Sequence, residues 1–191
     1  IPEVVKVISS KRSGAERKFT MPAACPVCGS SVVRTEGEAA VRCINASCSA
    51  QVKERIKHFA SKGAFDIDGL GNKLINQLVE KEMVASYADL FNLQFESLAA
   101  LDRMGEKSAE NLMDAIENSK KISFARFLYA LGIRHVGEHV AVLLANEFDS
   151  LQQLTKCSEE RLTDIEGVGP VVAQSITDFF KLIHRTCFNR S

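Results

Sequence analysis

Hydrophobic residues beyond Gly63 recur at helical spacing, and glycines interrupt them at regular intervals. Gly71, Gly105, Gly137 and Gly169 lie 34, 32 and 32 residues apart. Apolar residues stand four and one positions before each of these anchor glycines, and four and seven positions after it. Positions four and seven after the glycine share one face of a helix. The pattern therefore predicts four tandem units of helix, glycine turn and helix, and a mainly α-helical fold.

Two explanations of the glycines are open. In a plain array of helical hairpins, glycine only caps the first helix, as it commonly does. That explanation accounts for one glycine per unit, but it leaves further turn residues unexplained: Gly69, Gly167, Lys73, Lys107 and His139. A two-glycine turn also leaves the first amides of the second helix exposed, at the positive end of the helix dipole. Such a helix end binds an anion without the help of a lysine.

The turns are therefore candidates for contact with DNA phosphates. Two turns side by side could hold the phosphates of both strands across one groove, without reading the base sequence. The candidate DNA-binding residues are Gly69, Gly71, Lys73, Arg103, Gly105, Lys107, Arg134, His135, Gly137, Gly167 and Gly169. Arg103 and His135 replace the leading glycine, so turns two and three are expected to use side chains or to serve in packing. Pro170 removes one amide donor from turn four and pre-sets the start of its helix.

Three other function classes can be compared with these residues: a dinucleotide-binding turn, a protein-binding helical repeat and a catalytic site. A dinucleotide-binding turn is excluded, because no strand precedes "EGVGP" and Val172 stands where the third glycine would be. A helical repeat that binds proteins fits the same pattern and stays open. The sequence has no Gly-x4-Gly-Lys-Ser/Thr loop, no Gly-x-Ser-x-Gly and no His-Glu-x2-His. No self-contained catalytic site is expected, and no catalytic residue is assigned.

Charge is divided unevenly along the chain, although the formal net charge is zero. Residues 1–62 contain 11 Lys and Arg against 5 Asp and Glu, whereas residues 63–191 contain 13 against 19. The basic segment is compatible with nucleic acid and equally with a solvated surface. The acidic segment argues against DNA binding by bulk electrostatics, so any phosphate contact that it makes has to be local.

The composition, with 46% hydrophobic residues, is that of a folded chain. The sequence has no run of about 18 apolar residues and no signal-peptide pattern at its N-terminus. A cytoplasmic location without membrane contact is therefore expected. Because the chain begins without methionine, it is expected to be a piece of a longer protein.

Four of the six cysteines are spaced as metal ligands. Cys25, Cys28, Cys43 and Cys48 form two close pairs, C-x2-C and C-x4-C, separated by 14 residues. Two such pairs joined by a short hairpin let four thiolates converge tetrahedrally on one Zn2+. Because sulfur fills all four positions, the zinc is expected to be structural and to hold together a segment too small to fold by burial alone. The other two cysteines and the four histidines are not at ligand spacing.

The remaining stretches predict a few further elements. Between the cysteine pairs, "SVVRTEGEAAVRC" predicts two short strands about a turn near Gly37. Apolar residues of the stretch 50–62 recur at helical spacing. Residues 1–19 contain "EVVKVI", a strand-like stretch with too little chain around it to bury a face. It is expected to be the end of a preceding domain.

The order of these parts resembles the central and C-terminal region of the bacterial NAD-dependent DNA ligases. The stretches "CPVCGS", "HFASKGAFDIDGLGNKLINQLVEKEMV", "MGEKSAENL" and "FARFLYALGIRHVGE" are similar to that family's sequences. The resemblance implies that residues 1–19 end an oligonucleotide-binding (OB) fold and keep a remnant strand of it. It implies a zinc finger with its following helix in residues 20–62, and a helix-hairpin-helix domain of four repeats in residues 63–182. Residues 183–191 stay an unassigned tail.

The resemblance also implies a function. Enzymes of this family seal 3'-hydroxyl/5'-phosphate nicks in replication and repair through a lysine-AMP intermediate made from NAD, and these parts wrap nicked duplex DNA at its minor groove. The domain that uses NAD and Mg2+ has no counterpart in this sequence. The chain alone is therefore expected to bind nicked DNA as a monomer at the bacterial nucleoid, and to be inactive as a ligase. A non-enzymatic helix-hairpin-helix repair or junction-binding protein and a zinc-stapled protein-interaction scaffold are the alternatives.

Overall fold

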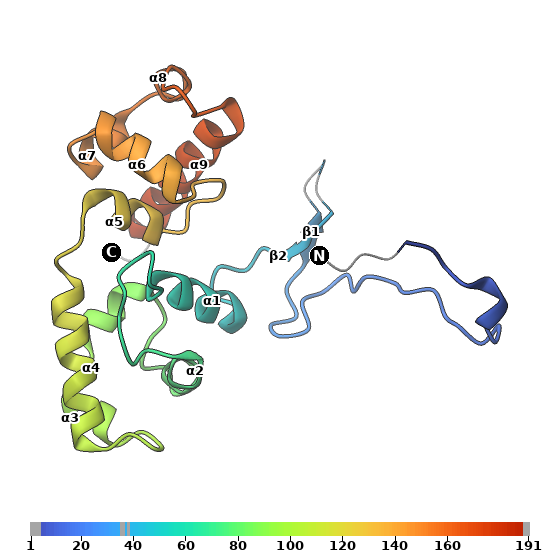
Figure 1. Cartoon of the computed structure of the whole chain (residues 1–191), viewed down its shortest axis with the longest axis horizontal. Coiled ribbons are helices and arrows are strands. Elements are labelled where there is room, and N and C mark those ends of the chain that lie inside the picture. Colours follow the sequence, from blue (N-terminus) through green and yellow to red (C-terminus); the bar gives the residue numbers. More distant parts are fainter. Residues whose placement is uncertain (1–4, 35–36, 38, 189–191) are drawn as a thin grey trace. The chain divides into compact units, whose positions relative to one another are not determined.

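Two short strands lie between the cysteine pairs, as the sequence predicts. The computed structural model describes residues 5–34, 37 and 39–188, with side chains as far as residue 182. β1 (Val32–Arg34) and β2 (Val41–Cys43) form an antiparallel pair, and η1 (Ser9–Lys11) is a 3-10 helix that precedes them. These elements belong to the first of two compact units, Ile1–Asn45 (Figure 1).

The remnant strand expected near the N-terminus does not form in the described residues 5–19. Val5 and Phe19 are 85% and 80% exposed, so this stretch buries no apolar face. A strand needs a neighbour to complete its ladder of hydrogen bonds, and the sheet described in this unit contains β1 and β2 alone. The prediction of a strand was therefore wrong for residues 5–19, while residues 1–4 lie outside the described residues. The assignment of this segment to an OB fold stays a prediction.

The second unit, Ala46–Ser191, is helical (Figure 1). Its elements are α1 (Ser49–Phe59), α2 (Asn72–Glu80), η2 (Tyr87–Asn92), α3 (Phe95–Ala99), α4 (Glu106–Ser119), α5 (Phe124–Ala130), α6 (Glu138–Glu147), α7 (Leu151–Lys156), α8 (Glu159–Thr163) and α9 (Pro170–Phe188). None of the helices in the described part of the chain combines the length and the apolar character that a membrane crossing requires.

Packed pairs of helices form the four predicted repeats. The pairs are α1 with α2, α3 with α4, α5 with α6, and α8 with α9. The apolar positions that define the repeat are Ile67, Leu70, Ile75, Leu78, Leu101, Met104, Ala109, Leu112, Ile133, Val136, Ala141, Leu144, Ile165, Val168, Ala173 and Ile176. All of them are buried except Met104, which is half-buried. The helical repeat and the mainly α fold are thereby confirmed.

Helix α1 is the first helix of the first hairpin. The sequence placed this stretch with the zinc finger, as the helix that follows it. In the structure, Val52, Ile56 and Phe59 lie on one face of α1 and are buried. They share a hydrophobic cluster with Leu74 and Leu78 of α2. The burial of this face therefore ties α1 to the hairpin repeats.

The repeats pair around two hydrophobic cores. One core is built from α1 to α4 and holds the first and second hairpins. The other is built from α5 to α9 and holds the third and fourth. The imidazole Nε2 of His58, on α1, lies 2.8 Å from the carbonyl oxygen of Tyr129, on α5, and so joins the two halves. The helical unit therefore has two halves, one with the first and second hairpins and one with the third and fourth. Within each half two hairpins share a core, so turn one is the neighbour of turn two and turn three is the neighbour of turn four.

Candidate metal centre and nucleic-acid interface

The four predicted metal ligands lie together. The sulfur atoms of Cys25, Cys28, Cys43 and Cys48 are all within 4.8 Å of one another. Cys25 and Cys48 are buried, whereas the other two are half-buried. The amide of Gly29 donates to the carbonyl of Cys25 over 2.9 Å and closes the first knuckle. Gly29 has φ 71°, a conformation that glycine adopts without strain.

The geometry and chemistry of the cluster fit a structural zinc ion. Zn–S bonds of about 2.3 Å place tetrahedral ligand sulfurs about 3.8 Å apart, and the sulfurs of Cys28 and Cys43 are 3.5 Å apart. The Asn45 amide, which donates to Cys43 Sγ, lowers the pKa of that thiol, but desolvation and the Cys28 and Cys25 thiols outweigh it and raise the pKa to about 11. Four thiolates therefore need a cation to coexist here, and an all-sulfur set suits structural Zn2+.

The four glycine turns share one backbone conformation. The residue two positions before the anchor glycine has a positive φ in every turn: Gly69 (80°), Arg103 (62°), His135 (63°) and Gly167 (89°). In every turn the residue just before the anchor glycine donates its amide to the carbonyl three residues earlier, over 2.9 to 3.3 Å. Arg103 and His135 thus build the same turn as glycine, at a steric cost of about 1–2 kcal/mol each.

The anchor glycines are not required by the fold. Gly71, Gly105 and Gly137 are the N-caps of α2, α4 and α6, with φ from −92° to −82°, where any residue can stand. A Cβ atom added to any of these three, or to Gly169, would meet no atom within 4 Å. The fold leaves open space at all four positions. Glycine there is explained if another molecule comes close to the backbone.

The leading glycines, by contrast, have a reason within the fold. Gly69 and Gly167 have a positive φ, a backbone conformation that residues other than glycine adopt only with strain. A Cβ on Gly167 would lie only 2.8 Å from Leu143 Cδ1, whereas one on Gly69 would lie 3.8 Å from Leu112 Cδ1. These two glycines therefore shape the turns, and the anchor glycines keep the turns accessible.

The second helices of the first three hairpins begin without a side-chain cap. At the start of α5, α7 and α8, the hydroxyls of Ser123, Ser150 and Ser158 accept a backbone amide of the first turn. No such bond caps α2, α4 or α6. The first amides of these helices therefore remain for an outside acceptor, at the positive end of the dipole. Turn four has one amide fewer, because α9 begins at Pro170.

Turns one and two lie side by side. From α2, Gln77 donates its Nε2 to the carbonyl of Asp102 and accepts the amide of Asp102 on its Oε1, each over 3.2 Å. A cavity of about 410 Å³ lies between the two turns. Gly69, Lys73 and Arg103 line it. The structure therefore brings three predicted DNA-binding residues to one site.

The other predicted residues are exposed but are not gathered at that cavity. The Lys107 side chain is 82% exposed, and its ammonium lies 3.2 Å from a Glu110 carboxylate oxygen. Arg134 and His135 are exposed in turn three. Turns one, two and four each have an exposed acid directly before the leading residue, namely Asp68, Asp102 and Glu166, where turn three has Arg134. The four turns thus share a backbone but differ in local charge.

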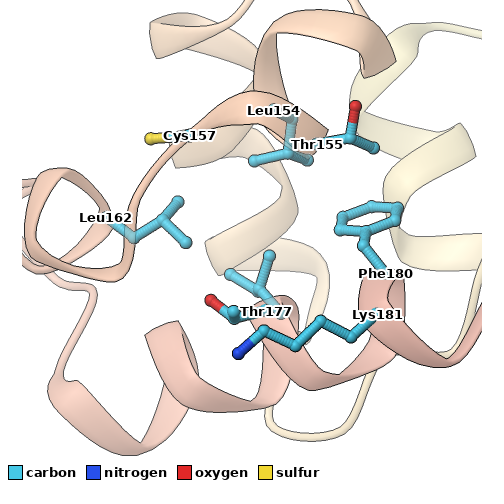
Figure 2. A pocket seen from close by; sticks show the side chains of 8 residues that line it. Leu154, Thr155, Cys157, Leu162, Thr177, Phe180 and Lys181 are labelled. Carbon is cyan, nitrogen blue, oxygen red and sulfur yellow. The ribbon is translucent and has the colours of Figure 1, made fainter. Parts of the chain in front are cut away.

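A cavity of about 450 Å³ between α7, α8 and α9 lies apart from the predicted site residues. Figure 2 shows Leu154, Leu162 and Phe180 around it, with the Cys157 thiol at its side. Burial raises the pKa of that thiol, which outweighs the opposing effect of Arg161. The raised pKa favours the neutral thiol, so Cys157 has the character of a packing residue.

Comparison with known proteins decides the family. Residues 24–50, which contain all four cysteines, match the model of the NAD-dependent DNA ligase C4 zinc finger domain. A protein named DNA ligase from Desulfosudis oleivorans is 60% identical over 181 residues, which is 94% of this chain. The chain belongs to the NAD-dependent DNA ligase family. It spans 26% of that relative's length.

The helical part of this DNA ligase family member matches two further models. Residues 64–118 match a SAM-like helix-hairpin-helix tandem, and residues 126–185 match a helix-hairpin-helix motif. These ranges agree with the pairing of hairpins around two cores. Proteins named DNA ligase from Geobacter metallireducens and Halothermothrix orenii are 55% identical over 180 residues and 52% identical over 185 residues. The chain covers 27% and 28% of their lengths, and 94% and 96% of it is aligned.

Sequence reasoning did not single out two side-chain amides at the cavity between turns one and two. Gln77 and Asn111 line that cavity together with the predicted residues. Each stands six positions after an anchor glycine, Gly71 or Gly105. An alignment of the repeats could have revealed them, because this position is a side-chain amide in the first two repeats and a leucine, Leu143, in the third.

Proposed function

We propose that this chain is the DNA-binding segment of an NAD-dependent DNA ligase that seals nicks in duplex DNA during replication and repair. The observation that carries the proposal is the open space at the four anchor glycines. A phosphate oxygen can approach the helix amides there, because no side chain stands in its way. Duplex DNA offers such oxygens at regular spacing on both strands.

The turns bind the backbone without reading sequence. Amides at the helix starts accept the phosphate charge locally, which suits a segment with a surplus of acidic residues. The residues proposed to contact DNA are Gly69, Gly71, Lys73, Arg103, Gly105, Lys107, Arg134, His135, Gly137, Gly167 and Gly169. Turns one and two, with Lys73 and Arg103 beside their shared cavity, form the best-equipped pair.

The other parts of the reaction are assigned outside these residues. Zinc bound by the four cysteines shapes the finger and takes no part in the chemistry, because sulfur occupies all four ligand positions. NAD and Mg2+ are proposed to act in a nucleotidyltransferase domain of the whole enzyme. The segment is proposed to act as a monomer on nicked duplex DNA at the nucleoid, in the bacterial cytoplasm.

Two measurements test the proposal. A titration of the chain with labelled nicked duplex at rising salt should show binding whose salt dependence is shallower than that of a strongly basic protein, because amides replace cations in many contacts. Absence of binding at low salt would refute the DNA-binding role. In the full-length protein, replacing all four anchor glycines by alanine should lower kcat/KM for nick sealing and leave self-adenylation by NAD unchanged. Unchanged sealing would contradict the role of the turns.

A further inference from the structure

We propose that Gln77 is a positioning residue that fixes turn two against helix α2 and so sets the geometry with which two neighbouring turns meet DNA. The inference rests on the proposed DNA-binding function of the turns. It concerns a residue that lies in neither turn. Gln77 stands on the second turn of α2, and its side chain is half-buried between the first two hairpins.

The side-chain amide of Gln77 pairs with both backbone groups of one residue. It donates to the carbonyl of Asp102 and accepts the amide of Asp102, with both distances 3.2 Å. A primary amide is suited to this task because it has donors and an acceptor in one plane. Asp102 directly precedes Arg103, which holds a positive φ of 62°. The bridge therefore holds turn two next to its most strained residue.

The equivalent position in the other half makes an apolar contact with a partner turn. Leu143, on α6, stands six residues after Gly137, as Gln77 stands six residues after Gly71. Leu143 packs so closely on turn four that a Cβ on Gly167 would lie 2.8 Å from its Cδ1. One register of the repeat thus contacts the neighbouring turn in both halves.

The two halves achieve this contact with different chemistry. Between turns three and four, a leucine packs directly against the glycine. Between turns one and two, a cavity of about 410 Å³ remains, and the bridge from Gln77 spans part of it. Hydrogen bonds have a directional preference that apolar contacts lack, so they can fix an orientation where packing is incomplete. In this half, the position of turn two depends on Gln77.

Replacement of Gln77 should therefore weaken DNA binding without a loss of any group that touches DNA. Gln77→Met keeps the length of the side chain and removes both bonds. Gln77→Glu keeps the acceptor but sets a carboxylate against the Asp102 carbonyl. Loss of the bridge is expected to weaken binding about tenfold, which corresponds to about 1.4 kcal/mol. The matched control is Gln152→Met, at an exposed glutamine of α7.

The experiment uses fluorescence anisotropy with a nicked duplex, together with amide hydrogen exchange of residues 102–105 in the free chain. Circular dichroism first establishes that each variant keeps the wild-type helix content. We expect faster amide exchange and about tenfold weaker DNA binding in both Gln77 variants. The dependence of their affinity on salt concentration should keep the wild-type slope, because the number of phosphate contacts does not change. Gln152→Met should behave like the wild type in all three measurements.

The outcomes separate this inference from the proposed function. If the wild-type chain does not bind nicked DNA at low salt, the proposed function fails. If the wild type binds and Gln77→Met binds equally well, the positioning role fails alone. Faster exchange with unchanged affinity would overturn it too, because the bridge would then stabilise the fold only. Wild-type affinity of Gln77→Glu would have the same consequence, since that variant lacks the donor.

Discussion

Replacement of an anchor glycine by alanine adds a single methyl group, and this change should lower DNA affinity while leaving the stability of the fold almost unchanged. At Gly71 the backbone has φ −82° and ψ 171°, an extended conformation open to alanine, and the new Cβ meets no atom within 4 Å. The remaining cost comes from the N-cap position, where alanine is less favourable than glycine by roughly 0.5–1 kcal/mol. For a unit of this size, 1 kcal/mol lowers the melting temperature by about 3 °C. Gly71→Ala and Gly169→Ala should therefore fold with almost unchanged stability.

DNA binding should respond much more strongly. The methyl group occupies the space through which a phosphate oxygen reaches the first amides of the helix. Loss of one hydrogen bond to a charged group costs about 1.5–3 kcal/mol, which is about a 10- to 150-fold loss of affinity. Gly169→Ala should lose less than Gly71→Ala, because Pro170 leaves turn four with one donor fewer. Anisotropy with nicked duplex measures both.

A cap that faces no proposed phosphate provides the matched control. Ser158 caps α8 and accepts the amide of Arg161 over 3.3 Å. Ser158→Ala should cost about 0.5–2 kcal/mol of stability, at least as much as the glycine variants, and leave DNA affinity unchanged. The reasoning is refuted if Gly71→Ala and Gly169→Ala bind nicked DNA like the wild type. It is also refuted if Ser158→Ala weakens binding as much as they do.

Three further predictions concern zinc, strain and pH. Cys25→Ser and Cys43→Ser should each release zinc and unfold residues 25–48 while the hairpin helices persist; metal analysis and circular dichroism check this, and retained zinc would contradict the ligand assignment. Arg103→Gly should raise stability by up to about 1 kcal/mol in thermal melts, because it removes the strain of a side chain at φ 62°, and should weaken DNA binding; a lower melting temperature would contradict it. Burial raises the pKa of Tyr87, against an opposing effect of Arg55, so the neutral phenol stabilises the fold below pH about 10 and this contribution is lost as pH rises further. Unfolding experiments from pH 8 to 11 should show a smaller alkaline loss in Tyr87→Phe than in the wild type, and equal losses would show that Tyr87 does not contribute.

The sequence predicted the elements whose physics is local. Apolar residues in fixed register around four glycines indicated the hairpin helices, because burial of one helix face imposes that register. Spacing alone also predicted that Cys25, Cys28, Cys43 and Cys48 lie together in a cluster that could hold a metal ion, because two short knuckles are enough to bring them together. The strand-like stretch in residues 5–19 was misleading, because β-propensity produces no strand without a partner.

Features that depend on contacts between repeats could not be predicted in the same way. All four repeats carry the same apolar register, so the pattern does not say which two share a core. The packing of α1 on α2 was hidden by the long stretch between them, residues 60–71, which contains no regular helix. The Gln77 bridge joins residues 25 positions apart in the sequence, and nothing local to either end indicates it.

The two glycine positions of the turn have different roles, and under the proposed function this difference accounts for the binding of a polyanion by an acidic segment. The leading position fixes the backbone at positive φ, and Arg103 and His135 show that a side chain can serve there at a cost in strain. The anchor position has no such demand, yet it is glycine in all four repeats and faces open space. If bulk charge attracted DNA, a lysine at the anchor would serve better than glycine. The absence of a side chain is an advantage only when the backbone amides themselves donate to the phosphate. Binding should then depend on amide geometry, and therefore on the positioning of each turn, more than on net charge.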